Sequence, residues 1–320
     1  MGKLTNTMIV CAIAGASLEA SAAAAPDYPT KSVRIVVNAA PGGSEVLARM
    51  VAKILTEGLG HSVIVDNRAG AGGNVGAEIV AHAAADGYTL LFCTSSVVVN
   101  QSLYPKLNYR LRELAPITQA ARFPVVVTVH PSVAVNNINE LIAFAKKRGG
   151  LNYGTTGAGS ISHLTGVLLN NLAGIDNVHV PYKGAAPMVN ALVGNELEMG
   201  IVNVFTAAPY VKAGRLRALA VSSPKPVPAL PGVPPLAAQF PGFEMHLWHG
   251  YLTTTGTPAP IIAALNTEIV KALKSPAVRE AAENGAGEIV ANTPEQFSAL
   301  IEQDLQKYAK LVKMSGARAD

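Results

Sequence analysis

The sequence has few cysteines, few aromatic residues and little charge, and each shortage excludes a class of protein. Two cysteines in 320 residues cannot form the dense disulfide framework of a small secreted scaffold. The net charge is only +4, and no Lys/Arg run reaches the roughly five residues typical of a nucleic-acid patch. After the first 25 residues no apolar run approaches the ~18 residues that suggest a membrane-spanning helix. We therefore expect a soluble mature chain without a nucleic-acid partner.

The first 25 residues have the features of a cleavable secretory signal peptide. Lys3 supplies a positive charge, residues 8–18 form a short uncharged apolar segment, and residues 21–25 are small enough for a signal peptidase site. Cleavage after Ala24 or Ala25 would also remove one of the two cysteines. The other, Cys93, could then form no intrachain disulfide, and its apolar surroundings predict a buried packing residue.

The mature chain alternates apolar runs of strand length with helical periodicity. Strands are expected at 33–38, 61–66, 88–94, 123–130, 151–154, 178–182, 197–204, 216–222 and 243–253. This alternation predicts an α/β fold with mostly parallel sheets. Residues 224–241 are rich in proline and predict an irregular loop. Near the end of the chain, Thr257 is expected to cap one helix, and Thr293 with Gln296 forms the capping box of another.

Four glycine-containing turns stand between expected strands and helices, at 39–44, 70–74, 154–160 and 182–186. Glycine allows the backbone to approach a ligand closely. The start of a helix adds free N–H groups and partial positive charge, which together favour an anion. In open α/β sheets such turns lie at the carboxyl ends of strands, where ligands bind. Two turns in each half of the chain therefore indicate a shared binding cleft between two lobes.

Known catalytic and nucleotide-binding motifs are missing or incomplete. No Gly-Lys-Ser/Thr follows any glycine turn, and neither the dinucleotide fingerprint nor the G-x-S-x-G nucleophile motif is complete. The seven histidines lack the spacing of a zinc site, so we expect no metal or cofactor. Ser160, Ser162 and His163 suggest a hydrolase, but at a helix start their side chains should diverge and one serine should be the N-cap. The single Trp248 is expected in the core.

A series of short motifs, in order along the whole mature chain, resembles the Bug-type periplasmic receptors of tripartite tricarboxylate transporters. The matching segments are Tyr28-Pro29, Pro41-Gly42-Gly43, Asp66-Asn67-Arg68 with Gly70 to Asn74, Ala85-Asp86-Gly87-Tyr88-Thr89, Leu151-Asn152-Tyr153-Gly154, Ser162-His163-Leu164, His179 to Gly184, and Gly256 to Pro260.

The resemblance implies a type II periplasmic-binding fold that closes over a small carboxylate. It implies a signal peptide at 1–25, a lobe I built from 26–123 and 246–320, and a lobe II at 124–245. The ligand-binding residues that it implies are Ala40, Gly42, Gly43, Thr94, Ser95, Thr156, Gly157, Ser160, His163, Tyr182, Gly184 and Asn203. The implied protein is a periplasmic monomer that is not an enzyme and delivers its ligand to membrane transporter subunits.

Two positions depart from the pattern of the family. Ser44-Glu45 is one residue shorter than usual and carries Glu in place of Asp, and Val202 stands where an Asp is common. The missing carboxylate at 202 suggests a ligand without an amino group. Two other functions remain open at this point: a secreted serine hydrolase using Ser160 and His163, and a receptor that feeds a sensor.

Overall fold

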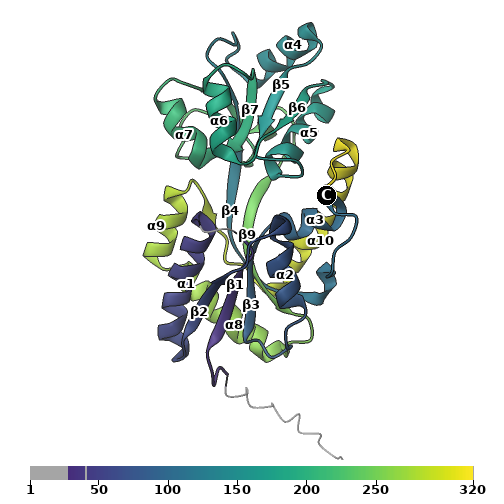
Figure 1. Cartoon of the computed structure of the whole chain (residues 1–320). Helices are drawn as coiled ribbons and strands as arrows, with labels where there is room; N and C mark the ends of the chain where they lie inside the picture. Colours follow the sequence, from purple (N-terminus) through teal and green to yellow (C-terminus); the bar gives the residue numbers. More distant parts are fainter. Residues whose placement is uncertain (1–27, 40–41, 320) are drawn as a thin grey trace, which may run out of the picture.

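The computed structural model describes residues 28–39 and 42–319. Two lobes stand one above the other in Figure 1, joined by the long strands β4 (Leu114–Val129) and β9 (His246–Thr254). The expected signal peptide and the expected ligand residue Ala40 lie outside the described residues. Within the described ranges no helix has the length and apolar character needed to cross a bilayer.

The remaining elements alternate as the sequence predicts. The other strands are β1 (Val33–Val37), β2 (Val63–Asn67), β3 (Thr89–Thr94), β5 (Asn152–Thr155), β6 (Val178–Pro181), β7 (Met199–Asn203), β8 (Arg217–Val221) and β10 (Glu288–Ile289). The α-helices are α1 (Gly43–Leu59), α2 (Asn74–Ala81), α3 (Ser96–Leu103), α4 (Ile138–Arg148), α5 (Ile161–Ala173), α6 (Ala185–Val193), α7 (Val204–Lys212), α8 (Ala259–Leu273), α9 (Pro276–Asn284) and α10 (Pro294–Ser315).

One mixed sheet runs through both lobes, in the order β2-β1-β3-β9-β4-β7-β5-β6, with β8 and β10 also paired to β4. In lobe I, β1 pairs in parallel with β2 and β3; in lobe II, β5 pairs in parallel with β6 and β7. Pairs that involve β4 or β9 are antiparallel. This arrangement is the two-lobed α/β fold of periplasmic binding proteins.

Strand register brings the carboxyl ends of strands from both lobes to one place. Thr94, the last residue of β3, pairs with His249 of β9, which pairs with Ala121 of β4. Asn203, the last residue of β7, pairs with Val125 of the same strand β4. We use the name junction for residues 121–125 of β4 together with the ends of β3 at Thr94 and of β7 at Asn203. Any ligand held by the turns of both lobes would sit here.

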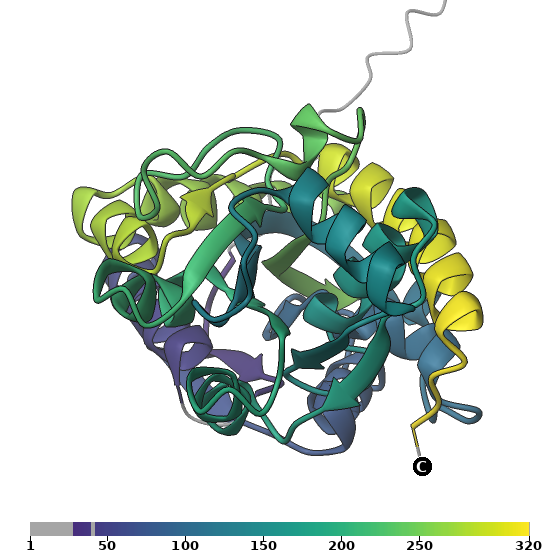
Figure 2. The same ribbon diagram turned by 90° about the horizontal axis from the view of Figure 1, so that it is seen from above.

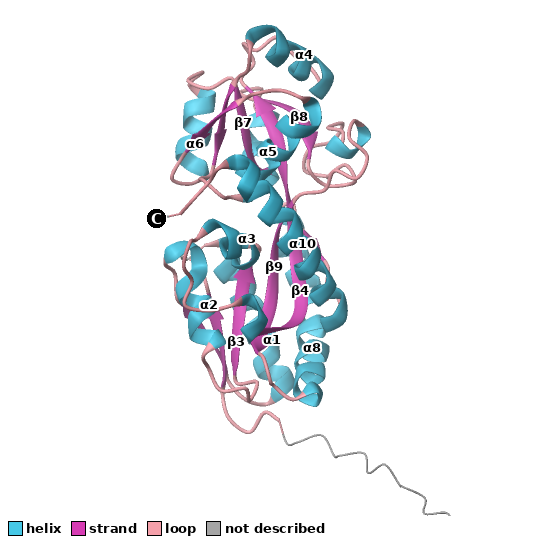
Figure 3. Ribbon diagram, turned by 90° about the vertical axis from the view of Figure 1, so that its right-hand side faces the viewer, coloured by secondary structure: helices cyan, strands magenta, loops and turns pink. Residues whose placement is uncertain are grey.

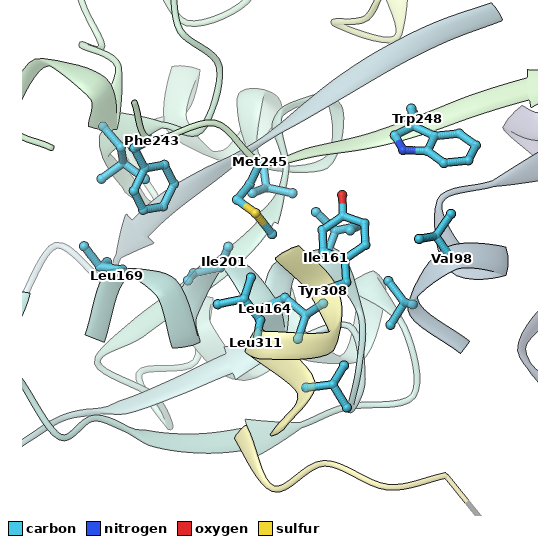
Figure 4. Close-up of a cluster of buried hydrophobic side chains, with 14 of the residues drawn as sticks. Val98, Ile161, Leu164, Leu169, Ile201, Phe243, Met245, Trp248, Tyr308 and Leu311 are labelled. Atoms are coloured by element: carbon cyan, nitrogen blue, oxygen red, sulfur yellow. The ribbon is translucent and has the colours of Figure 1, made fainter. Parts of the chain in front are cut away.

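The apolar core is continuous between the lobes along one set of helices. Leu164 of α5, Trp248 of β9 and Leu311 of α10 belong to one buried cluster that also includes α3 (Figure 4). Helices α1, α8 and α9 form a second cluster and α6 and α7 a third, so among the described residues the core is divided there. Figure 3 shows α10 rising beside β4 and β9 toward the upper lobe, and viewed from above α10 passes along one flank of the molecule (Figure 2).

Two local predictions near helix starts have different outcomes. The capping box of α10 is confirmed: Gln296 N–H donates to the Thr293 hydroxyl (3.3 Å), and Thr293 N–H donates to the Gln296 side chain (3.1 Å). The cap expected at Thr257 is wrong by one residue, because Pro258 is the N-cap of α8. The Thr257 hydroxyl instead donates to the carbonyl of Thr254 in the preceding turn (2.8 Å).

Strand β4 begins nine residues earlier than expected at Phe123. Its first half pairs along β9, with irregular register near Pro116 and Gln119. Thr118, Gln119 and Arg122 interrupt the apolar run in this half, so the sequence shows no clear strand pattern there. Pairing with β9 supplies the backbone hydrogen bonds that sequence periodicity alone does not reveal.

Candidate functional site

The first turn of α1 follows β1 at the junction and has no side-chain cap. Gly42 is the N-cap residue and makes no side-chain hydrogen bond to the helix, which begins at Gly43. The Glu45 carboxylate in this turn pairs with Arg49 at 2.7 Å. The first turn therefore retains backbone N–H groups for a partner outside the helix.

Ser44 connects this turn to a crossing strand. Its hydroxyl lies 2.7 Å from Nε2 of His249 on β9. The His249 ring is buried, stacked on Phe92 and met edge-on by Phe123. Burial lowers the pKa of His249 to about 4, so the imidazole is neutral at physiological pH. This contact fixes the start of α1 against the junction.

Five buried polar side-chain atoms have no hydrogen-bond partner among the described residues. Two of them directly follow strands of lobe I: the Ser95 hydroxyl, fully buried between β3 and α3, and the amide nitrogen of Asn38, after β1. The others are Nδ1 of His249 and the hydroxyls of Tyr251 and Ser275. The Ser95 N–H donates to the Trp248 carbonyl at 2.9 Å, whereas α3 has no side-chain cap. Beside it, the Thr94 hydroxyl contacts the Ser96 hydroxyl at 2.8 Å. Buried polar groups in proteins are nearly always hydrogen-bonded, so the Ser95 hydroxyl and the Asn38 amide are available to a bound ligand or an ordered water.

In lobe II a group of hydroxyls surrounds the start of α5. Ser160 is the N-cap, as expected for one of the serines: its hydroxyl accepts from His163 N–H (3.2 Å) and donates to the Gly157 carbonyl (2.7 Å). The Ser162 hydroxyl lies 2.9 Å from that of Ser160 and 3.0 Å from that of Thr156. The expectation that the serine side chains diverge is wrong, because the 156–160 turn folds back over the helix start.

His163 does not join this hydroxyl group. Its Nδ1 accepts from Gly159 N–H (3.1 Å), and its ring stacks on His179 with centroids 3.6 Å apart. It lines a separate cavity of about 650 Å³ with Asn170 and Met314. Because no hydrogen bond joins the Ser160 hydroxyl to this ring among the described residues, the pair lacks the geometry of a nucleophile and its base.

Lobe II contributes two further helix starts without side-chain caps. Gly184 precedes α6, and Asn203 precedes α7 directly after β7. Tyr182, two residues before Gly184, donates its backbone N–H to the Thr155 carbonyl at 3.1 Å. These residues, with Thr156 and Gly157, are the lobe II part of the expected set.

The lobes touch where the 157–160 turn meets α3. A Cβ added to Gly159 would clash with Leu103, and the backbone φ of Gly159 is +71°. The Leu103 carbonyl also accepts from Ala319 N–H at 3.1 Å, after the end of α10. A glycine is needed at 159 for both the turn and this close approach.

One expectation about the site is corrected, and another stays a prediction. At the 70–74 turn, expected to bind an anion, residues 70–72 are exposed, while Asn100 donates to the Gly72 carbonyl at 3.0 Å and a Cβ on Gly73 would lie 2.6 Å from the Asn38 amide nitrogen. Val202 is fully buried in the α6–α7 cluster rather than lining the junction. Its identity therefore reflects core packing and says nothing about a ligand amino group.

Cys93 and Trp248 lie in the core, as the sequence predicts. Cys93 is buried, and burial raises the pKa of its thiol. Trp248 is also buried, with its ring N–H donating to Asp304 at 2.8 Å. Among the described residues no three His, Cys, Asp or Glu side chains are placed to hold a metal ion.

Comparisons with known proteins decide the family. Residues 47–317 match the family model described as the tripartite tricarboxylate transporter family receptor. The chain belongs to this family. It is 36% identical to Protein BugT of Bordetella pertussis over 324 residues, covering 98% of this chain and 99% of BugT.

Solved structures of the receptor family share its fold. An R. palustris protein solved with adipate, Rpa4515, is 32% identical with a TM-score of 0.76, covering 91% of this chain and 99% of that protein. MatC of Rhodopseudomonas palustris, solved with bound malate, is 28% identical with a TM-score of 0.73, covering 89% and 100%. This receptor is accordingly a periplasmic solute-binding protein and not an enzyme, which removes the hydrolase alternative.

Several polar groups near the site were not predicted as ligand contacts from the sequence. Asn38 ends an expected strand, Ser44 lies within an expected glycine turn, and Ser162 stood out only as a hydrolase candidate and as part of a family motif. His249 had no sequence signal at all, because its partner Ser44 is 205 residues away.

Three buried histidines, His163, His246 and His249, and the half-buried His179 should make the receptor sensitive to acid. Burial lowers the pKa of His163 and His246 to about 3 and of His179 and His249 to about 4. The unfolded chain keeps the ordinary value of about 6.5, so the stability they contribute is complete above that pH and is lost as pH falls toward the folded values. We expect the urea midpoint to fall between pH 6.5 and 4.5. His179→Gln should flatten this dependence and the exposed His82→Gln should not; equal slopes in all three proteins would contradict the prediction.

Proposed function

We propose that this receptor binds a small carboxylate at the junction and delivers it to the membrane components of a tripartite transporter. The observation that carries the proposal is that α1, α3, α6 and α7 begin without side-chain caps. They follow strands of both lobes, of which β3 and β7 are tied to the junction by register. Free N–H groups and the partial positive charge of each helix start favour a carboxylate.

The proposed contacts come from both lobes. Lobe I would contribute the backbone of Gly42 and Gly43 and the side chains of Thr94 and Ser95, where the buried Ser95 hydroxyl lacks a partner. Lobe II would contribute Thr156, Gly157, Ser160, Tyr182, Gly184 and Asn203. His163 would position the 157–160 turn through its bond to Gly159 rather than touch the ligand. Ala40 remains a prediction beyond the described residues.

The proposed motion is a hinge closure about β4 and β9. Lobe I would comprise 26–123 and 246–320 and lobe II 124–245, so the hinge would lie near Phe123-Pro124 and Met245-His246. The core shared by α3, α5 and α10 would act as the pivot, because moving it would expose apolar surface. The lobes would then close where the core is divided, beside α1 and α7. A ligand that binds the closed form shifts the open–closed equilibrium toward it.

The adipate and malate complexes of the structural neighbours support this ligand class. The proposed location is the periplasm, after removal of residues 1–25 as a signal peptide. Membrane transporter components would recognise the closed, loaded form.

A carboxylate panel tests the proposal directly. Thermal unfolding and calorimetric titration would compare adipate, succinate, malate, benzoate and glutamate with the uncharged diamide of adipate. Ligand at about 100 times its Kd should stabilise the folded state by about 2.7 kcal/mol. We expect at least one carboxylate to raise the melting temperature and the diamide to have no effect. Equal effects of adipate and its diamide, or no effect of any carboxylate, would contradict the proposal.

A further inference from the structure

Two large apolar side chains are exposed in the first turns of helices at the junction. Phe205, in the first turn of α7, is 61% exposed, and Val46, in the first turn of α1, is 56% exposed. They belong to different lobes. The N-cap residues of the same two helices are Asn203 and Gly42, and neither makes a side-chain capping hydrogen bond.

Both side chains lie outside the cores of their own lobes. The neighbours Val204 in α7 and Leu47 in α1 are buried in the clusters of those helices, so each helix already has its apolar side covered. Phe205 and Val46 are additional apolar residues on α7 and α1, two helices whose buried clusters are separate between the lobes. Of the other exposed apolar residues, Val75, 39% exposed, is in the first turn of α2, and Leu172 is in the last turn of α5.

We propose that Phe205 and Val46 contact the hydrocarbon part of the ligand, so that this receptor selects carboxylates with an extended apolar body over short hydroxylated ones. The inference rests on the proposed function and adds the substrate class. Helix starts satisfy the charge of one carboxylate group but supply no affinity for a hydrocarbon chain. A phenyl ring and a branched aliphatic side chain, brought together by closure, supply it by removing apolar surface from water.

The chemistry of the other proposed contacts suits the carboxylate group of the ligand rather than its hydrocarbon part. Besides the Tyr182 ring and the Asn203 amide, they offer backbone N–H groups and small hydroxyls, and they include no Arg or Lys side chain. Glu45, the acid in the first turn of α1, is already paired with Arg49. The side chains of Phe205 and Val46 therefore add, beside the Tyr182 ring, apolar surface that discriminates between ligands that share a carboxylate.

Calorimetric titration with succinate, malate, adipate and suberate tests the inference. The unmodified receptor should bind adipate at least about tenfold more tightly than malate, the lower end of what a methylene group is worth in an apolar pocket. Phe205→Ala should weaken adipate and suberate by about tenfold while changing succinate little, and Phe205→Leu should restore most of the loss. Leu172→Ala, which removes an exposed apolar side chain elsewhere, should leave all four affinities unchanged.

The outcomes separate this inference from the proposed function. If carboxylates bind but Phe205→Ala weakens all of them equally or none, or if malate binds more tightly than adipate, the apolar contact is wrong and the carboxylate receptor stands. If no carboxylate binds the unmodified protein, both fail.

Discussion

Replacing Gly43 with Asp is expected to weaken carboxylate binding by a hundredfold or more without unfolding the receptor. Gly43 is the first residue of α1, and among the described residues no heavy atom lies within 4 Å of a Cβ built there. The new carboxylate would occupy the proposed anion position. Two like charges about 4 Å apart repel by about 4 kcal/mol at an effective dielectric constant of 20, which exceeds the ~2.7 kcal/mol of a hundredfold change.

The same substitution should leave the melting temperature unchanged or slightly higher. An acid in the first turn stabilises a helix by about 0.3–1 kcal/mol, and a non-glycine residue restricts the unfolded chain. Gly43→Asn has nearly the same shape without the charge, so it should weaken binding by less than tenfold. Equal affinities of the Asp and Asn variants for adipate, measured by calorimetry, would show that the start of α1 does not hold the ligand charge.

Replacing Trp248 with Ala should reduce the free energy of unfolding by about 3–5 kcal/mol, the usual cost of removing a large buried aromatic. The ring is 1% exposed and meets Phe297 edge-on at a centroid distance of 5.2 Å. It belongs to the cluster that continues from one lobe into the other (Figure 4). The variant also leaves Asp304, 2% exposed, without the Trp248 N–H. The loss is measured by urea unfolding with circular dichroism as the signal. Tryptophan fluorescence cannot be used, because the variant lacks the only tryptophan in the sequence.

Two controls separate packing from hydrogen bonding at Trp248. Trp248→Phe keeps much of the apolar contact and loses the donor, while Asp304 keeps its ion pair with Lys307 at 2.7 Å. It should therefore cost about 1.5–3 kcal/mol, the contribution of a hydrogen bond to a charged group. Phe205→Ala removes a largely exposed ring and should change stability by less than about 0.5 kcal/mol. A Trp248→Ala loss no larger than that of Phe205→Ala would mean that the shared cluster does not hold the lobes together.

The order of strands and helices could be predicted from the sequence because its signals are local. Alternation, helical periodicity and the Thr293 capping box depend on residues close together in the chain. Strand β4 was harder to predict, since its first half is recognisable only by its pairing with β9. Strand β10 has two residues, too few for any period, and exists because Glu288 and Ile289 pair with β4.

The candidate site could be predicted only in part. The sequence identified the glycine turns and the serines at the start of α5, but it treated the 70–74 turn as equal to the others. The side chains of Asn100 and Asn38, which lie against Gly72 and Gly73 of that turn, come from separate parts of the chain. Position 202 was expected to face the ligand, yet the alternation of side chains along β7 places it in the core.

The sequence by itself determined the receptor family, the α/β class and the positions where helices begin beside glycine. The tertiary structure alone decided which of those helix starts share the junction, that Ser44 meets His249, and that the core is continuous on one side and divided on the other. The physical reason is that propensities and caps act within a few residues. Burial and the pairing of polar groups depend instead on segments that meet only when the chain folds, as Phe205 and Val46 would across the two lobes.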